Sequence, residues 1–130
     1  MKILIVEDDF ASRSLLNEFL TPYADCDVCV NGREAFDAFK FAFNHGVPYD
    51  VICLDIMMPE MDGIESLTKI RDFEKDNCVD DTKRTKIIMI TAVNTPTTVI
   101  ESFDKKADGY IVKPVDLDSL ITHLKHFKFI

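Results

Sequence analysis

Five short apolar runs, each followed by a segment with helical spacing, constrain the fold of this 130-residue chain most strongly. Continuous apolar runs of this length are typical of strands that are buried on both faces of a parallel sheet. The runs are Ile3–Val6, Cys26–Val30, Val51–Leu54, Ile87–Ile90 and Tyr110–Val112. Because right-handed crossovers place helices on both sides of such a sheet, we expect a doubly wound α/β fold with five parallel strands.

The segments between the runs repeat apolar residues at helical spacing. The clearest apolar face consists of Leu117, Leu120, Ile121, Leu124 and Phe127. Side chains suited to capping helix N-termini precede these segments, because their oxygens accept hydrogen bonds from free backbone N–H groups. The predicted caps are Asp9, Asn31, Asp62 (with Glu65 as a capping box), Thr95 before Pro96, and Asp116. We expect the polar segment Phe73–Lys86 to extend the third helix and then form a solvated loop.

Charge and chain length exclude several classes of function. The formal net charge is −8 and no Lys/Arg cluster is long enough for a basic patch, so we expect no nucleic-acid partner. The apolar stretch before Glu7 is too short for a signal peptide or a membrane span, so we expect a cytoplasmic protein. The fifth helical pattern ends the sequence, so we expect one domain over residues 1–130 and no output domain.

Cys26 and Cys29 form a Cys-x-x-Cys pair, a spacing that some redox and zinc sites use. Here the pair lies in an alternating run, and a strand would point the two thiols to opposite faces of the sheet. No second pair follows, and the three histidines are scattered. We therefore interpret all four cysteines as reduced thiols without a metal.

Reactive side chains follow four of the five predicted strands. Ligands of parallel α/β sheets bind beyond the carboxyl ends of the strands. The residues at these ends are Glu7, Asp8 and Asp9 after the first run, Asp55 after the third, Thr91 after the fourth and Lys113 after the fifth. Each alone has an ordinary structural explanation, such as helix capping by Asp9. Their joint occurrence at four strand ends favours a single site.

Electrostatics indicates what such a site binds. Two carboxylates about 4 Å apart repel by roughly 4 kcal/mol at an effective dielectric near 20, so a cluster of Glu7, Asp8 and Asp55 needs a proton or a cation. An all-oxygen site with few protein ligands suits Mg²⁺, which keeps several waters and bridges to phosphate. An Asp carboxylate is a known nucleophile toward phosphorus, and Lys113 and Thr91 carry the groups that phosphoryl oxygens need.

These residues resemble the receiver domain of bacterial two-component response regulators over essentially the whole chain. The matching segments are Ile3–Asp9, Asp50–Gly63, Ile88–Ala92 and Gly109–Pro114. The resemblance implies a flavodoxin-like (βα)5 fold with strand order 2-1-3-4-5. It also implies a stand-alone phosphorelay protein that is not an enzyme, apart from catalysing its own phosphorylation and dephosphorylation.

The resemblance assigns a role to each residue of the predicted site. Asp55 is the expected phospho-acceptor, and Lys113, joined to Pro114 by a cis bond, contacts the phosphoryl group. Asp8, Asp55 and the Met57 backbone carbonyl are the expected direct Mg²⁺ ligands. Glu7 is expected to reach the ion through water.

The resemblance further implies a conformational switch and its partners. Phosphorylation draws the Thr91 hydroxyl inward, Tyr110 rotates from an outward to an inward rotamer, and the surface of the fourth helix, fifth strand and fifth helix changes shape. The expected partners are a histidine kinase or histidine phosphotransfer protein and an unidentified downstream protein, with the chain a monomer or a phosphorylation-dependent dimer. Met57 and Val93 cannot orient an attacking water, so we expect slow loss of the phosphoryl group.

Three alternatives share parts of this pattern. A haloacid-dehalogenase-type phosphatase needs a second Asp where Met57 stands. A flavin carrier needs a phosphate-binding loop after the first strand, and the acidic residues 7–9 would repel that phosphate. A binding module of the same fold that works without phosphate remains the open alternative.

Overall fold

A single five-stranded parallel sheet forms the centre of the computed structural model, which describes residues 1–130. The strands are β1 (Lys2–Val6), β2 (Asp25–Cys29), β3 (Val51–Leu54), β4 (Lys86–Thr91) and β5 (Gly109–Val112). Their order is β2-β1-β3-β4-β5, which confirms the predicted order and the doubly wound fold. Val6 pairs with Cys29 on one side and with Leu54 on the other, so the carboxyl ends of these strands meet at one edge.

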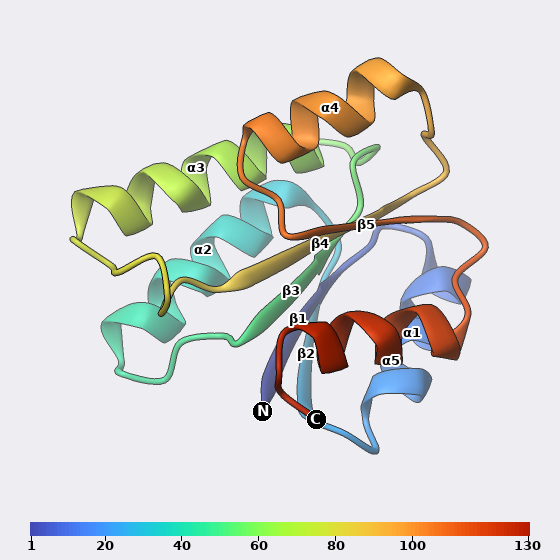
Figure 1. Ribbon diagram of the computed structural model, residues 1–130, viewed down its shortest axis with the longest axis horizontal. Helices are drawn as coiled ribbons and strands as arrows, with labels where there is room; N and C mark the ends of the chain where they lie inside the picture. Colours follow the sequence, from blue (N-terminus) through green and yellow to red (C-terminus); the bar gives the residue numbers. More distant parts are fainter.

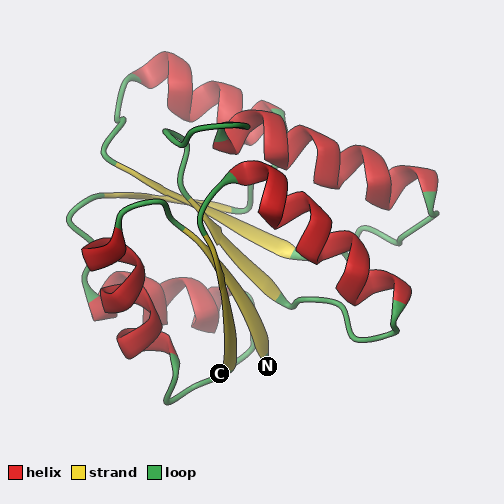
Figure 2. Ribbon diagram, turned by 180° about the vertical axis from the view of Figure 1, so that it is seen from behind, coloured by secondary structure: helices red, strands yellow, loops and turns green.

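Helices cover both faces of the sheet, as Figures 1 and 2 show. Helices α1 (Phe10–Leu20) and α5 (Leu117–His126) lie on one face. Helices α2 (Gly32–Asn44), α3 (Gly63–Asp76) and α4 (Pro96–Asp104) lie on the other. No helix combines the length and the apolar character that crossing a bilayer requires.

All five helices begin with a side chain that accepts a hydrogen bond from a backbone N–H group in the first turn. Every predicted cap is confirmed, and the capping residues are Asp9, Asn31, Asp62, Thr95 and Asp116. Such caps satisfy backbone donors that the helix itself leaves free. They therefore fix where each helix departs from the carboxyl edge of the sheet.

Two apolar layers hold the helices against the sheet. One contains 15 buried residues, including Leu4 and Ile52, and packs beneath α2 and α3. The other contains 11, including Ile3 and Ile5, and packs beneath α1 and α5. The three central strands are buried on both faces, as predicted, because each contributes alternate residues to the two layers.

Strand β2 departs from that expectation. It lies at the edge of the sheet, and most of its residues are exposed, with Val28 at 49% exposure. An edge strand has a neighbour on one side only, so the helices do not cover it fully. The expected placement of its two cysteines on opposite faces is confirmed, because Cys26 packs in one apolar layer and Cys29 in the other.

The polar segment 73–86 extends α3 to Asp76 and then forms a connection to β4, as predicted. Its beginning and end are not solvated, however. Glu74 and Thr85 are buried, and the Glu74 carboxylate accepts a hydrogen bond from the Thr85 N–H at 2.8 Å. The expectation of a fully solvated loop is therefore wrong at Thr85, because the buried Glu74 carboxylate of α3 accepts its backbone N–H there.

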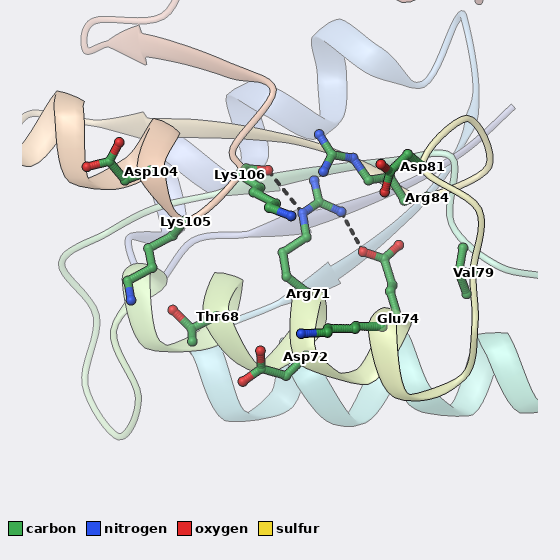
Figure 3. A pocket seen from close by; sticks show the side chains of 11 residues that line it. Thr68, Arg71, Asp72, Glu74, Val79, Asp81, Arg84, Asp104, Lys105 and Lys106 are labelled. Atoms are coloured by element: carbon green, nitrogen blue, oxygen red, sulfur yellow. Dashed lines mark hydrogen bonds and ion pairs between the residues drawn. The ribbon is translucent and has the colours of Figure 1, made fainter.

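A buried ion network anchors this connection. The Arg71 guanidinium lies 2.6 Å from Glu74 and 2.7 Å from Asp108, and Arg84 lies 3.0 Å from the same Asp108 carboxylate. Arg71 also donates to the Lys106 carbonyl at 3.0 Å. Arg71, Glu74 and Arg84 border a charged hollow of about 470 Å³ between α3, the α3–β4 connection and the start of the α4–β5 connection (Figure 3). The network thus ties α3 to the α4–β5 connection.

Candidate functional site

The residues that follow β1, β3 and β5 meet at the carboxyl edge of the sheet. The Lys113 ammonium donates to the Glu7 carboxylate at 2.6 Å and to the Asp55 carboxylate at 3.2 Å. Glu7 and Asp55 are 1% and 5% exposed, so both carboxylates lie in a largely desolvated setting. The structure thus brings together the central residues that the sequence predicts there.

Asp8 completes an acidic cluster on the exposed side of this edge. One carboxylate oxygen from each of Glu7, Asp8 and Asp55 lies within 4.8 Å of the others. Asp8 and Met57 also border the same open hollow of about 400 Å³. Oxygen-only donors, one of them exposed to solvent, fit a hard divalent cation that keeps part of its water shell, as Mg²⁺ does.

Burial and neighbouring charges shift the pKa values of Glu7 and Lys113. Burial raises the pKa of Glu7 above its ordinary 4.5, and the charge of Asp55 adds to this, although the Lys113 hydrogen bond works against it. Burial alone would lower the pKa of Lys113, but the Glu7 hydrogen bond and the Asp55 charge raise it above 10.5. Lys113 therefore carries a firmly held positive charge among the carboxylates.

The backbone around Asp55 is held from two sides. The Met57 N–H donates to the Asp55 carboxylate at 3.3 Å. Gly63, the first residue of α3, lies so close that a Cβ atom there would be 2.1 Å from the Asp55 carbonyl oxygen. The Gly63 N–H donates to the Ile56 carbonyl at 2.8 Å. Only glycine at position 63 therefore allows the chain to follow this path.

The turn between β1 and α1 is held by a contact that sequence reasoning missed. The Arg13 guanidinium donates to the Glu7 carbonyl at 3.0 Å and approaches the Asp8 carbonyl at 3.4 Å. The Asp9 N–H donates to the Glu7 carboxylate at 3.1 Å. The position of Arg13 one turn into the predicted helix was the only indication in the sequence that it faces this turn.

Thr91 and Tyr110 share a neighbour in the connection after β4. Thr91 is buried, and its hydroxyl accepts a hydrogen bond from the Val93 N–H at 3.3 Å. The Tyr110 hydroxyl donates to the Val93 carbonyl. Burial raises the pKa of Tyr110, and the charge of Asp55 adds to this. The two predicted switch residues therefore contact the same backbone segment.

An apolar rim lies beside Lys113. Leu15 and Leu16 of α1 face Pro114 and Val115 across a hollow of about 320 Å³, to which Lys113 also contributes. The Lys113–Pro114 peptide bond is cis, as predicted. Phe10 begins α1 and is 73% exposed.

The strand order β2-β1-β3-β4-β5, together with carboxylates and a lysine at the carboxyl edge, assigns this chain to the flavodoxin-like signalling domains. The family model for the response regulator receiver domain matches residues 3–125, and the chain belongs to this family, the receiver domains of two-component systems.

Relatives of known function and structure agree with this family. The chain is 37% identical over 125 residues to the transcriptional regulatory protein SrrA of Staphylococcus aureus, covering 95% of this chain and 46% of that protein. It thus spans about half the length of this curated relative.

Among solved structures, the CheX–CheY–BeF₃–Mg²⁺ complex from Borrelia burgdorferi matches with a TM-score of 0.83 and 29% identity, covering 98% of this chain and 89% of that chain. The co-crystal of Ypd1 with the Ssk1 receiver domain from Saccharomyces cerevisiae matches with a TM-score of 0.84 and 27% identity, covering 98% and 88%.

Proposed function

We propose that Asp55 accepts a phosphoryl group from a phosphohistidine on a histidine kinase or histidine phosphotransfer protein. One observation carries this proposal: the Lys113 ammonium lies 3.2 Å from the buried Asp55 carboxylate at the carboxyl edge of the sheet. A carboxylate that is held beside a cation is oriented for attack on an incoming phosphorus atom.

In the proposed transfer, an Asp55 carboxylate oxygen forms a bond to phosphorus while the bond from phosphorus to the donor imidazole nitrogen breaks. The electron pair of that bond stays on the imidazole. Lys113 neutralises charge on one phosphoryl oxygen, and the Thr91 hydroxyl turns from Val93 to donate to another. The Met57 N–H, which contacts Asp55 at 3.3 Å, is a further donor at this position.

We assign the Mg²⁺ site to Asp8, Asp55 and the Met57 backbone carbonyl, with Glu7 reaching the ion through water. A bound ion here would supply positive charge against the phosphoryl oxygens and the carboxylates. The oxygen-only cluster of three carboxylates supports this assignment. Two similar structures are complexes with Mg²⁺ and BeF₃: the CheX–CheY complex from Borrelia burgdorferi and the CKI1 receiver domain from Arabidopsis thaliana.

The phosphodonor in this proposal is a protein rather than a small molecule. A donor histidine that reaches Asp55 must cover the rim beside Lys113, and this rim is apolar at Leu15 and Val115. Phe10 adds an exposed apolar side chain at the start of the same helix, α1. Apolar surface around a polar centre is typical of protein interfaces. A similar structure contains a phosphotransfer protein, Ypd1, together with the receiver domain of Ssk1.

We further propose that phosphorylation acts on a partner-binding face formed by α4, β5 and α5. Thr91 links the phosphoryl group to Val93, and Tyr110 contacts the Val93 carbonyl from β5. Movement of Thr91 toward phosphate therefore frees Tyr110 to change its contact. Three exposed apolar side chains on this face would meet the downstream partner: Ile100, Phe103 and Val112.

The test is incubation with acetyl phosphate, with and without Mg²⁺, followed by intact-mass measurement. The proposal predicts the mass gain of one phosphoryl group with Mg²⁺ and none for Asp55→Asn. Asp72→Asn is the matched control, because Asp72 is an exposed aspartate on α3 away from this edge. Equal labelling of the wild type and Asp55→Asn would contradict the proposal. No labelling of either protein by acetyl phosphate or by a phosphohistidine donor would favour a binding module that works without phosphate.

A further inference from the structure

Arg13 reaches from the first turn of α1 back to the turn that carries the acidic cluster. Its guanidinium donates to the Glu7 carbonyl at 3.0 Å and lies 3.4 Å from the Asp8 carbonyl. The guanidinium also lies over the Phe10 ring, 5.5 Å from its centroid. Arg13 is half-buried, so its orientation is constrained by contacts on two sides.

These contacts act on the backbone of the residues that supply the cation ligands. The Glu7 N–H is bound to the Cys29 carbonyl at 3.1 Å, so Glu7 is fixed to the sheet. Asp8, by contrast, is exposed and follows the last strand residue by two positions. Both contacts come from one guanidinium nitrogen, Nη1, which thereby bridges two successive carbonyl groups of the turn.

The charge of Arg13 by itself would have the opposite effect. A guanidinium close to a cluster of carboxylates repels a cation that binds to them, so its charge alone would weaken Mg²⁺ binding. Removing the side chain would then tighten binding. If Arg13 instead orients the turn, removing it would weaken binding. The two roles predict changes of opposite sign.

We propose that Arg13 is a positioning residue for the cation site, and that its hydrogen bonds to the Glu7 and Asp8 carbonyls hold the Asp8 carboxylate toward Asp55. This inference rests on the proposed Mg²⁺ site. Residues that orient metal ligands contribute about 10- to 100-fold to metal affinity. For an exposed turn with one strong and one weak contact, the lower end, about tenfold, is the expected size.

The experiment measures the Mg²⁺ dissociation constant by isothermal titration calorimetry for the wild type, Arg13→Ala and Arg13→Lys. We expect Arg13→Ala to weaken binding about tenfold and Arg13→Lys, which keeps a charged donor, to recover part of the loss. Arg33→Ala is the matched control, because Arg33 is an exposed arginine near the start of α2. It should leave the constant unchanged.

Thermal unfolding without Mg²⁺ shows that each variant is folded before titration, and Arg13→Gln replaces any variant that is not. Unchanged or tighter Mg²⁺ binding by folded Arg13→Ala or Arg13→Gln, with normal binding by the wild type, would overturn the role of Arg13 alone. Absence of Mg²⁺ binding by the wild type would overturn the proposed cation site and this inference with it.

Discussion

Lys113 and Glu7, which are 106 residues apart in the sequence, form the closest ion pair at the carboxyl edge, with 2.6 Å between the ammonium and a carboxylate oxygen. Asp55 lies farther from the same ammonium, at 3.2 Å. Lys113 therefore serves as the internal counter-ion of the acidic cluster. Its charge lowers the repulsion that Glu7 and Asp55 would otherwise exert on each other.

Replacing Lys113 by Met should destabilise the protein when Mg²⁺ is absent. The Lys113 side chain is 22% exposed, so we expect a loss of about 2 kcal/mol, less than for a fully buried pair. Added Mg²⁺ should narrow the difference, because it supplies the missing charge. Urea unfolding with and without Mg²⁺ checks this, with the exposed Lys105→Met as control. Equal stability of Lys113→Met and the wild type without Mg²⁺ would contradict the counter-ion role.

Replacing Arg71 by Met should destabilise the fold to the same extent with and without Mg²⁺. The change leaves the buried Glu74 carboxylate, and Asp108, without their shared cation. Breaking a buried ion pair from one side costs about 3 kcal/mol. Urea unfolding of Arg71→Met measures the loss. Lys75→Met, an exposed change on the same helix, should differ from the wild type by less than about 0.5 kcal/mol. A similar small effect for Arg71→Met would show that the network is not structural.

The phosphoryl group on Asp55 should be lost slowly, because the nearby Met57 side chain has no strong donor or acceptor for an attacking water. Met57 is 68% exposed, so a polar side chain there meets solvent without strain. Met57→Gln should hydrolyse about tenfold faster, since positioning a water assists its attack. Decay of the phosphorylated mass after removal of acetyl phosphate gives the rate. Fast decay in the wild type, or an unchanged rate in Met57→Gln, would refute this.

The cap of α5 should show a pH-dependent effect of defined sign. The hydrogen bond from the Ser119 N–H lowers the pKa of Asp116 below 3.8. A lowered pKa in the folded state stabilises the protein above pH 3.8, and this contribution is lost as the pH falls through the lowered value. Asp116→Asn keeps a capping oxygen but no charge, so its melting temperature should lie below that of the wild type at pH 7. The difference in melting temperature between Asp116→Asn and the wild type should disappear toward pH 2. A gap independent of pH would contradict this.

The convergence of Glu7, Asp55, Thr91 and Lys113 follows from the sequence for a physical reason. Each residue ends or directly follows a buried apolar run, and parallel strands bring their carboxyl ends to one edge. Helix caps can likewise be predicted from the local sequence, because a capping side chain binds a backbone group three residues away. The fold and the centre of the site were therefore predictable from patterns of only a few residues.

The features that could not be predicted depend on contacts between distant segments. The Arg71–Asp108 ion pair joins residues 37 apart, and neither residue stands out from the other charged positions on the surface. Tyr110 binds the Val93 carbonyl, a backbone atom without any sequence signature. The exposure of β2 follows from its position at the edge of the sheet, which the expected strand order contains but the apolar run alone does not.

A crystal structure with Mg²⁺ and beryllofluoride would show whether Asp55 is the phosphoryl acceptor. We expect beryllofluoride bound to the Asp55 carboxylate, with Mg²⁺ held by Asp8, Asp55 and the Met57 carbonyl, and with Lys113 turned from Glu7 toward the fluorides. A structure in which both ligands are absent from this edge, with Lys113 still bound to Glu7, would contradict it.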